Sequence, residues 1–160
     1  MRTRKIVDKV LEWTLVFLMS VLVLDVLWQV ASRYVFNSPS SYTDELAGYL
    51  LIWVGLLGAA YVAGKREHLA IDLLLQRSSE KRKFKLEMII SVIVVVFAVT
   101  VMVIGGSWLV STRFYLSVKS SALGIPLGVI YLALPISGLL IAYFNIDDMH
   151  NMVKANHKTN

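Results

Sequence analysis

The stretch MIISVIVVVFAVTVMVIGGSWLV, residues 88–110, contains no charged side chain. A helix needs about 20 mostly apolar residues to cross the hydrocarbon layer of a bilayer, and this stretch is long enough. The period-two alternation of a membrane β-barrel is missing from it. Because a spanning backbone must satisfy its own hydrogen bonds in lipid, the stretch predicts a transmembrane helix.

Three further apolar segments have the same character. We expect four transmembrane helices, at approximately 10–35, 44–64, 86–117 and 125–146, in a single integral membrane domain spanning 1–160. The chain is 57% hydrophobic and 17% charged, whereas soluble domains are roughly 45–50% apolar and about 25% charged. A chain of this size cannot hide so much apolar surface in its own core. The predicted fold class is therefore an all-α membrane protein.

The basic residues predict the orientation. All but three of the 16 Lys and Arg residues lie in the N-terminal segment, the 65–85 connection or the C-terminal tail; the exceptions are Arg33, Arg113 and Lys119. Cytoplasmic loops carry the excess of Lys and Arg, so we expect both termini and the 65–85 connection in the cytoplasm. The basic N-terminus also resembles a cleavable signal peptide, but its apolar run exceeds the roughly 7–15 residues of such signals. We expect an anchor helix.

The 65–85 connection carries His68, Asp72 and Gln76 at successive i, i+4 positions among leucines. This pattern favours a short amphipathic helix in the membrane interface, with the basic residues that follow near anionic headgroups. A plain extension of the second span, with a solvated charge run, is the alternative.

Prolines and glycines predict irregularities within and between the spans. Pro135 lies inside the fourth span, where it should kink the helix and free a carbonyl. Gly105-Gly106 could weaken the third span in a similar way. Residues 37–39, Asn-Ser-Pro, should end the first helix. The polar tail from Asp147 onward is expected to fray.

The segment RYVFNSPSSYTDEL, residues 33–46, places a basic and two acidic side chains between two apolar spans. Ser40, Ser41 or Thr43 can cap the second helix, and Asp44 and Glu45 then lie in its first turn, where the helix dipole favours acids. Capping alone would explain both acids. Arg33 lies across the turn, within reach of an ion pair, although it could also extend to the outer headgroups.

Asp25, Gln29 and Arg33 share one helix face. Asp25 falls near mid-bilayer, where a charge costs about 2.5–3.5 kcal/mol, so this face should point toward protein. Asp25 and Arg33 are roughly 12 Å apart along the axis, so Asp25 either pairs with another helix or chain or is a neutral acid. A subunit interface is predicted from this face, Asp44 and Glu45, together with the row of small residues Gly55, Ala59 and Ala63, which lets helices approach closely.

The segment RYVFNSPSSYTDELAGYLLIWVGLLGAA, residues 33–60, resembles the signature of the small membrane subunit of tripartite ATP-independent periplasmic (TRAP) transporters, the DctQ-like family. EHLAIDLLLQ, with His68 and Asp72, is similar to the segment after that family's second helix, and SALGIPLGVIYLALPISGLLI is similar to its fourth. Tyr42 stands where the family often has tryptophan, and Asp44 where glutamate is common. The resemblance covers nearly the whole chain.

The resemblance implies a bacterial inner-membrane protein that acts as a scaffold for a large multi-span TRAP subunit, together with a soluble periplasmic binding protein. The complex would import an organic acid, of the sialic acid or C4-dicarboxylate class, driven by sodium. Sodium and substrate sites are expected in the large subunit. No cofactor, metal or catalytic residue is expected in this chain, and membrane lipids but no nucleic acid are expected as partners.

Two other classes of protein are alternatives to a transporter subunit. A self-sufficient four-helix exporter could use Asp25 as a proton-coupled site, although no acid lies within the uncharged third and fourth apolar runs. A membrane enzyme or redox subunit is disfavoured, because His68, His150 and His157 all lie outside the predicted spans and cannot form paired haem ligands in the bilayer. Cysteine is absent, which excludes thiolate chemistry, and no hydrolase or phosphate-loop motif occurs.

Overall fold

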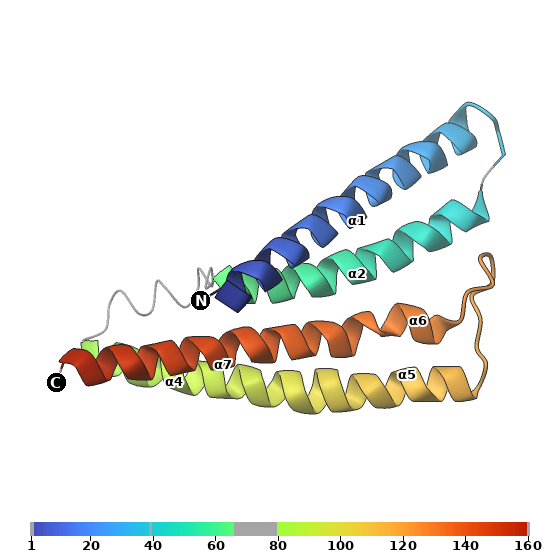
Figure 1. Cartoon of the computed structure of the whole chain (residues 1–160). Coiled ribbons are helices and arrows are strands. Elements are labelled where there is room, and N and C mark those ends of the chain that lie inside the picture. Colours follow the sequence, from blue (N-terminus) through green and yellow to red (C-terminus); the bar gives the residue numbers. More distant parts are fainter. Residues whose placement is uncertain (1, 39, 66–79, 160) are drawn as a thin grey trace.

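The computed structural model describes residues 2–38, 40–65 and 80–159. Figure 1 shows two long helical hairpins side by side, with the chain termini toward one end of the bundle and the α1–α2 and α5–α6 connections at the other. The first hairpin consists of α1 (Arg2–Tyr34) and α2 (Ser41–Lys65). In the second, α4 (Glu80–Phe97), η1 (Ala98–Gly105) and α5 (Gly106–Tyr115) form one continuous rod that packs against α6 (Leu127–Tyr131) and α7 (Ala133–Thr159).

Four helical stretches are long and apolar enough to cross a membrane, which confirms the predicted number of spans. They are Arg4–Tyr34, Ser41–Lys65, Phe84–Tyr115 and Leu127–Lys154. No β-strand occurs within the described ranges; Lys119 and Pro126 form one isolated antiparallel bridge in the α5–α6 connection. The predicted interfacial helix with His68 and Asp72 lies outside the described residues.

The predicted turn between the first two spans is confirmed. α1 ends at Tyr34, and Asn37 adopts a positive φ of 50°, a left-handed conformation that asparagine tolerates better than most residues. α2 begins at Ser41, where the hydroxyl of Thr43 donates to the carbonyl of Ser40 over 2.9 Å. Asp44 lies in the first turn of α2, as the capping argument requires.

The predicted kink in the fourth span is also present. The helix is interrupted at Leu132, between α6 and α7. Pro135 has no N–H to donate to the carbonyl four residues earlier, that of Tyr131, and the helix breaks beside that carbonyl. In the third span, the irregularity is a π-helical segment, η1, which ends at Gly105. The glycine pair therefore marks the end of the distortion.

α7 occupies the centre of the bundle. Phe144 is fully buried with Leu11, Leu57 and Ala60, so this cluster joins α1, α2 and α7. A second cluster of Ala98, Met102 and Ala142 joins η1 to α7. Gly138 makes the second contact possible: a Cβ there would lie 2.7 Å from the Cβ of Met102 and 3.1 Å from the carbonyl oxygen of Ala98. The helices approach closely because the residues between them are small.

The expectation that the tail frays from Asp147 was wrong. α7 continues as a helix to Thr159, and Asp148 is buried. The reason is a long-range contact with the N-terminal helix, because Arg4 bonds to both Asp147 and Asp148. A polar sequence after an apolar span gives no indication of such a contact.

Candidate subunit interface

Arg4 connects three helices at the end of the bundle where the termini lie. Its guanidinium donates to Asp147 Oδ2 over 2.7 Å, to Asp148 Oδ1, and to the carbonyl oxygen of Gly64 over 2.6 Å. It also lies above the ring of Phe144, 5.7 Å from the centroid. A planar guanidinium can satisfy several acceptors at once in a way that an ammonium group cannot. We call Arg4, Gly64, Asp147 and Asp148 the Arg4 cluster; it fixes the start of α1 against α2 and α7.

Glu45 has the corresponding role at the opposite end. Its carboxylate accepts the backbone N–H groups of Ser121, Ala122 and Leu123 at 2.8–3.0 Å. The hydroxyls of Ser120 and Tyr49 also donate to it, at 3.1 and 2.7 Å. We call these residues the Glu45 cluster. It attaches the α5–α6 connection to the first turns of α2, because the carboxylate supplies acceptors to backbone donors that no helix satisfies.

The face with Asp25, Gln29 and Arg33 turns partly toward α2. Asp25 is 9% exposed, and its Oδ2 has no hydrogen-bond partner in the described part of the chain. Gln29 donates to Asp44 Oδ1, so helix α2 itself provides a partner for this face. Arg33 is exposed and lines a cavity of about 180 Å³ with Asp44, but no ion pair joins Arg33 to Asp44 or Glu45.

The row of small residues on α2 is divided between two environments. Ala63 is buried within the bundle, whereas Gly55 and Ala59 are exposed. A Cβ added at Gly55 would meet no atom within 4 Å. Leu51 and Val62 extend the same exposed strip, at 61% and 41% exposure. We call Leu51, Gly55, Ala59 and Val62 the α2 strip; it is an apolar helix surface that no described residue covers.

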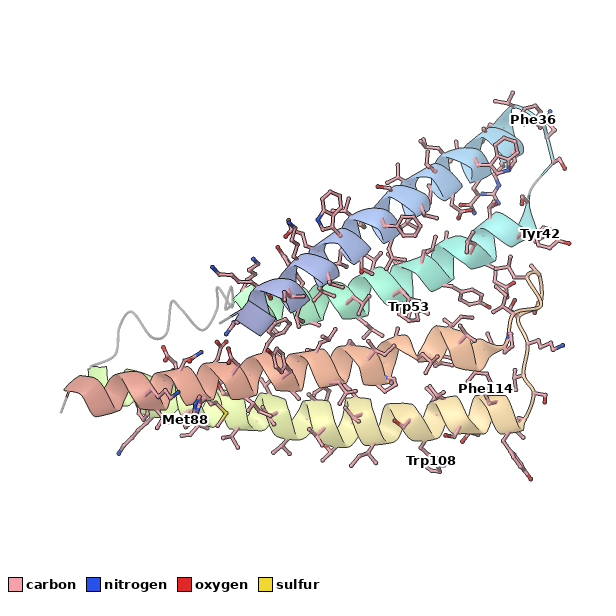
Figure 2. The ribbon with its side chains drawn as sticks, viewed as in Figure 1. Phe36, Tyr42, Trp53, Met88, Trp108 and Phe114 are labelled. Atoms are coloured by element: carbon pink, nitrogen blue, oxygen red, sulfur yellow. The ribbon has the colours of Figure 1, made fainter. Side chains whose placement is uncertain are left out.

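Helix α1 leaves even more apolar surface uncovered. Only 6% of the residues in its most apolar window are buried, against 44% for the span formed by α6 and α7. Large side chains such as Phe17 and Leu24 are 67% exposed. Figure 2 shows that α5 also turns an aromatic side chain, Trp108, away from the other helices. The uncovered surface must face lipid or another polypeptide, since water would not solvate it.

No group of three His, Asp or Glu side chains comes together as a metal site in the part of the chain that the structure describes. The polar side chains at the two ends, including Arg4, Glu45 and Gln29, are used in contacts between helices. This arrangement holds helices in place.

The sequence interpretation missed the Arg4 cluster and the internal role of Glu45. Arg4 contributed to the charge bias only, and Asp147-Asp148 was assigned to a frayed tail. One available signal was the pair of adjacent acids directly after an apolar span, at the same end as a basic N-terminus. Glu45 was predicted at a subunit interface, whereas its oxygens are bonded within the chain.

Comparison with known proteins agrees with this architecture. The family described as "Tripartite ATP-independent periplasmic transporters, DctQ component" matches residues 22–155. The chain is 26% identical over 151 residues to the sialic acid TRAP transporter small permease protein SiaQ of Vibrio cholerae, covering 94% of this chain and 86% of that protein. It is 28% identical over 138 residues to a Haemophilus influenzae protein provisionally named a TRAP transporter small permease protein, covering 85% and 83%.

A longer relative matches in part. The sialic acid TRAP transporter permease protein SiaT of Haemophilus influenzae is 38% identical over 81 residues, which make up 50% of this chain and 13% of that protein. The family match extends over most of the chain and includes all four spans in whole or in part. The chain is therefore a member of the DctQ family, the small membrane component of TRAP transporters, and is not an enzyme.

Proposed function

We propose that this chain is the static membrane scaffold of a sodium-coupled, binding-protein-dependent importer of an organic acid. The observation that carries the proposal is the uneven burial of its spans. One hairpin packs closely on itself around α7, while α1 and the α2 strip leave apolar surface uncovered. A scaffold needs a rigid body together with a free surface for its partner.

The α2 strip is the surface that we assign to the large multi-span subunit. Gly55 and Ala59 permit a partner helix to approach the backbone of α2 closely, and Leu51 and Val62 flank them with apolar side chains. The opposite sides of α2 are already covered by α1 and α7. Support for a permease partner comes from SiaT, in which a stretch similar to half of this chain forms part of a longer permease protein.

Of the three residues predicted at the interface on α1, two have a role within the chain and one has a role toward the partner. Asp25 and Gln29 lie toward α2, so they would shape the α1–α2 hairpin that presents the strip. Arg33 is exposed at the turn and remains available to a partner. His68 and Asp72 have no assigned role here.

The charge bias supports an orientation with both termini in the cytoplasm of a bacterial inner membrane. The Glu45 cluster and the two hairpin turns would then lie at the periplasmic side. A soluble binding protein would approach the complex from that side. Sodium ions and the substrate would be bound by the large subunit.

The substrate class follows only from the relatives. Two of the relatives carry sialic acid in their names, and we extend that class, with the C4-dicarboxylates as the other candidate, to this chain's complex. Both are anionic organic acids. Selectivity would depend on the large subunit and the binding protein.

The alternative function is a self-sufficient exporter that uses Asp25. One observation favours it: Asp25 is a buried acid with an oxygen that has no hydrogen-bond partner in the described part of the chain. A lone acid in a span is a functional candidate by default. The neighbouring side chains on the same face of α1, Gln29 and Arg33, are not acids and would not pass a proton on from Asp25. The scaffold is therefore the better supported proposal.

Co-purification and transport together test the proposal. The chain should capture a co-expressed large TRAP permease, and the double variant Gly55→Leu/Ala59→Leu should reduce that capture at least tenfold, because side chains would fill the strip. Ser107→Leu, on the exposed side of α5, is the matched control and should capture normally. In liposomes, sodium-driven uptake should require both membrane proteins and the binding protein. Transport by the chain alone, abolished by Asp25→Asn, would establish the exporter.

A further inference from the structure

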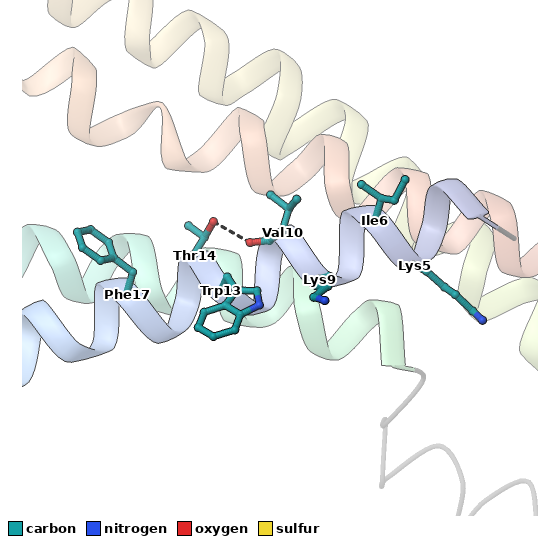
Figure 3. Close-up of a pocket in the computed structure, with 7 residues that line it drawn as sticks. All are labelled: Lys5, Ile6, Lys9, Val10, Trp13, Thr14 and Phe17. Carbon is teal, nitrogen blue, oxygen red and sulfur yellow. Dashed lines mark hydrogen bonds between the residues drawn. The ribbon is translucent and has the colours of Figure 1, made fainter.

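A second uncovered region lies on the first half of α1, at the end of the bundle near the termini. Lys5, Lys9 and Trp13 follow one another at i, i+4 spacing along one side of the helix, and Figure 3 shows them with the apolar side chains beside them. A surface hollow of about 850 Å³ is lined by Lys5, Ile6, Lys9, Val10, Trp13, Thr14 and Phe17. Every lining residue comes from α1, so the hollow is open to the surroundings of the helix.

The polar groups of this hollow are available to a ligand. Thr14 donates its hydroxyl to the carbonyl of Val10 over 2.8 Å and is thereby satisfied. Neither Lys5 nor Lys9 forms an ion pair with an acid of the described chain, in contrast with their neighbour Arg4. The hollow therefore presents two ammonium groups that no described acid pairs with, flanked by apolar side chains.

A ligand that matches this surface must have an anionic group joined to a long apolar part. Lysine side chains extend their charged ends toward the lipid headgroups, and tryptophan is enriched at the same depth, where its N–H can donate. Ile6 and Val10 lie next to the two lysines along the helix, and Phe17 lies one turn beyond Trp13, toward the middle of the helix. An acidic protein segment would match the lysines but not the apolar portion.

We propose that Lys5, Lys9 and Trp13 form a binding site for one anionic phospholipid, whose phosphate lies between the two ammonium groups and whose acyl chain lies along Ile6, Val10 and Phe17. A lipid there would cover part of α1 that the protein leaves bare, beside the Arg4 cluster that attaches this helix to α7. The proposal does not depend on which solute the complex transports.

Quenching of Trp13 fluorescence by brominated lipids tests the proposal. The full chain, with Trp28, Trp53 and Trp108 replaced by phenylalanine, is reconstituted in phosphatidylcholine with increasing mole fractions of brominated phosphatidylglycerol or brominated phosphatidylcholine. We expect half-maximal quenching at an about 25-fold lower mole fraction of the phosphatidylglycerol, since each of the two lysines near the membrane surface contributes about a fivefold preference for anionic lipid. A protein that retains only Trp28, exposed farther along α1, should show no preference.

Charge variants of the protein that retains only Trp13 test whether the two lysines cause the preference for phosphatidylglycerol. Lys5→Gln/Lys9→Gln should abolish the preference, and Lys5→Arg/Lys9→Arg should retain it. Lys85→Gln/Lys154→Gln removes the same charge from exposed positions in α4 and α7, and should leave the preference unchanged. Equal quenching by the two lipids, or a preference that survives Lys5→Gln/Lys9→Gln, would overturn the proposal. If addition of the large permease protects Trp13 from both lipids, the hollow is a protein contact and the lipid site is excluded.

Discussion

Helix α1 and the α6–α7 span are almost equally apolar but are used in opposite ways. Their best windows have mean hydropathies of 2.2 and 2.1, yet 6% of the first is buried and 44% of the second. In a bilayer apolarity drives insertion, while packing between helices depends on how closely their surfaces fit. Hydropathy therefore predicts that a segment crosses the membrane, but does not predict which other helix it contacts.

The difference lies in the side chains that face the neighbouring helices. α7 presents small residues at the contacts, including Ala133, Ser137, Gly138 and Ala142, all of which are buried. α1 carries large side chains around most of its circumference and contacts α2 along one side through residues such as Leu11. A span with small contact residues becomes the centre of the bundle, and a span with large ones remains at its edge.

The largest expected effect is the loss of Phe144, the fully buried ring between α1, α2 and α7. Phe144→Ala should lower the free energy of unfolding by about 3 kcal/mol, because it leaves a cavity in the packed region. The measurement is reversible unfolding by dodecyl sulfate in mixed micelles. Phe17→Ala makes the same change on the exposed side of α1 and should cost less than about 0.5 kcal/mol. Equal losses for the two variants would mean that the two regions do not differ in packing.

A substitution at Gly138 tests the packed region by adding a methyl group, whereas Phe144→Ala removes a side chain. In Gly138→Ala the new Cβ would come within 2.7 Å of Met102 Cβ, so α7 and η1 must move apart. We expect a loss of about 1–3 kcal/mol in the same unfolding assay. Gly58→Ala is the matched control, because nothing lies within 4 Å of a Cβ on that glycine in α2. A neutral Gly138→Ala would show that the η1–α7 contact is looser than the structure indicates.

Arg4 tests the attachment of α1 to the packed region. Arg4→Gln removes the cation between Asp147 and Asp148 and should cost about 1–2 kcal/mol. Hydrogen bonds to charged groups contribute about 1.5–3 kcal/mol, and solvent screening lowers this value because Arg4 and Asp147 are partly exposed. Arg4→Lys keeps the charge but cannot reach Gly64 and both acids together, so its loss should be intermediate. Lys154→Gln, an exposed charge on α7, should be neutral. If the lysine variant matches the wild type, charge alone holds the helix.

The sequence was sufficient for the number of spans, the turn at 35–40 and the break caused by Pro135, because each depends on local chemistry. It was not sufficient for contacts between residues far apart in the chain. Arg4 and Asp147 are separated by 143 positions, and nothing in their local patterns pairs them. Glu45 shows the same limit, since an acid at the start of a helix satisfies the capping pattern whether its oxygens bind that helix or, as here, the α5–α6 connection.

Glu45 should give the smallest and most local effect, because it joins the two hairpins through a connection and not through their cores. Glu45→Gln replaces one carboxylate oxygen with an NH2 donor, so the side chain can no longer accept all three N–H groups: that of Ser121 donates to one oxygen, and those of Ala122 and Leu123 donate to the other. We expect the exchange of these three amide hydrogens to accelerate on the order of tenfold, while amides in α7 keep their protection. Hydrogen exchange read by mass spectrometry resolves the two regions. Glu12→Gln, an exposed acid on α1, should change neither. Faster exchange throughout α7 in Glu45→Gln would mean that the connection stabilises the central helix, and that the packed region depends on its contact with α2.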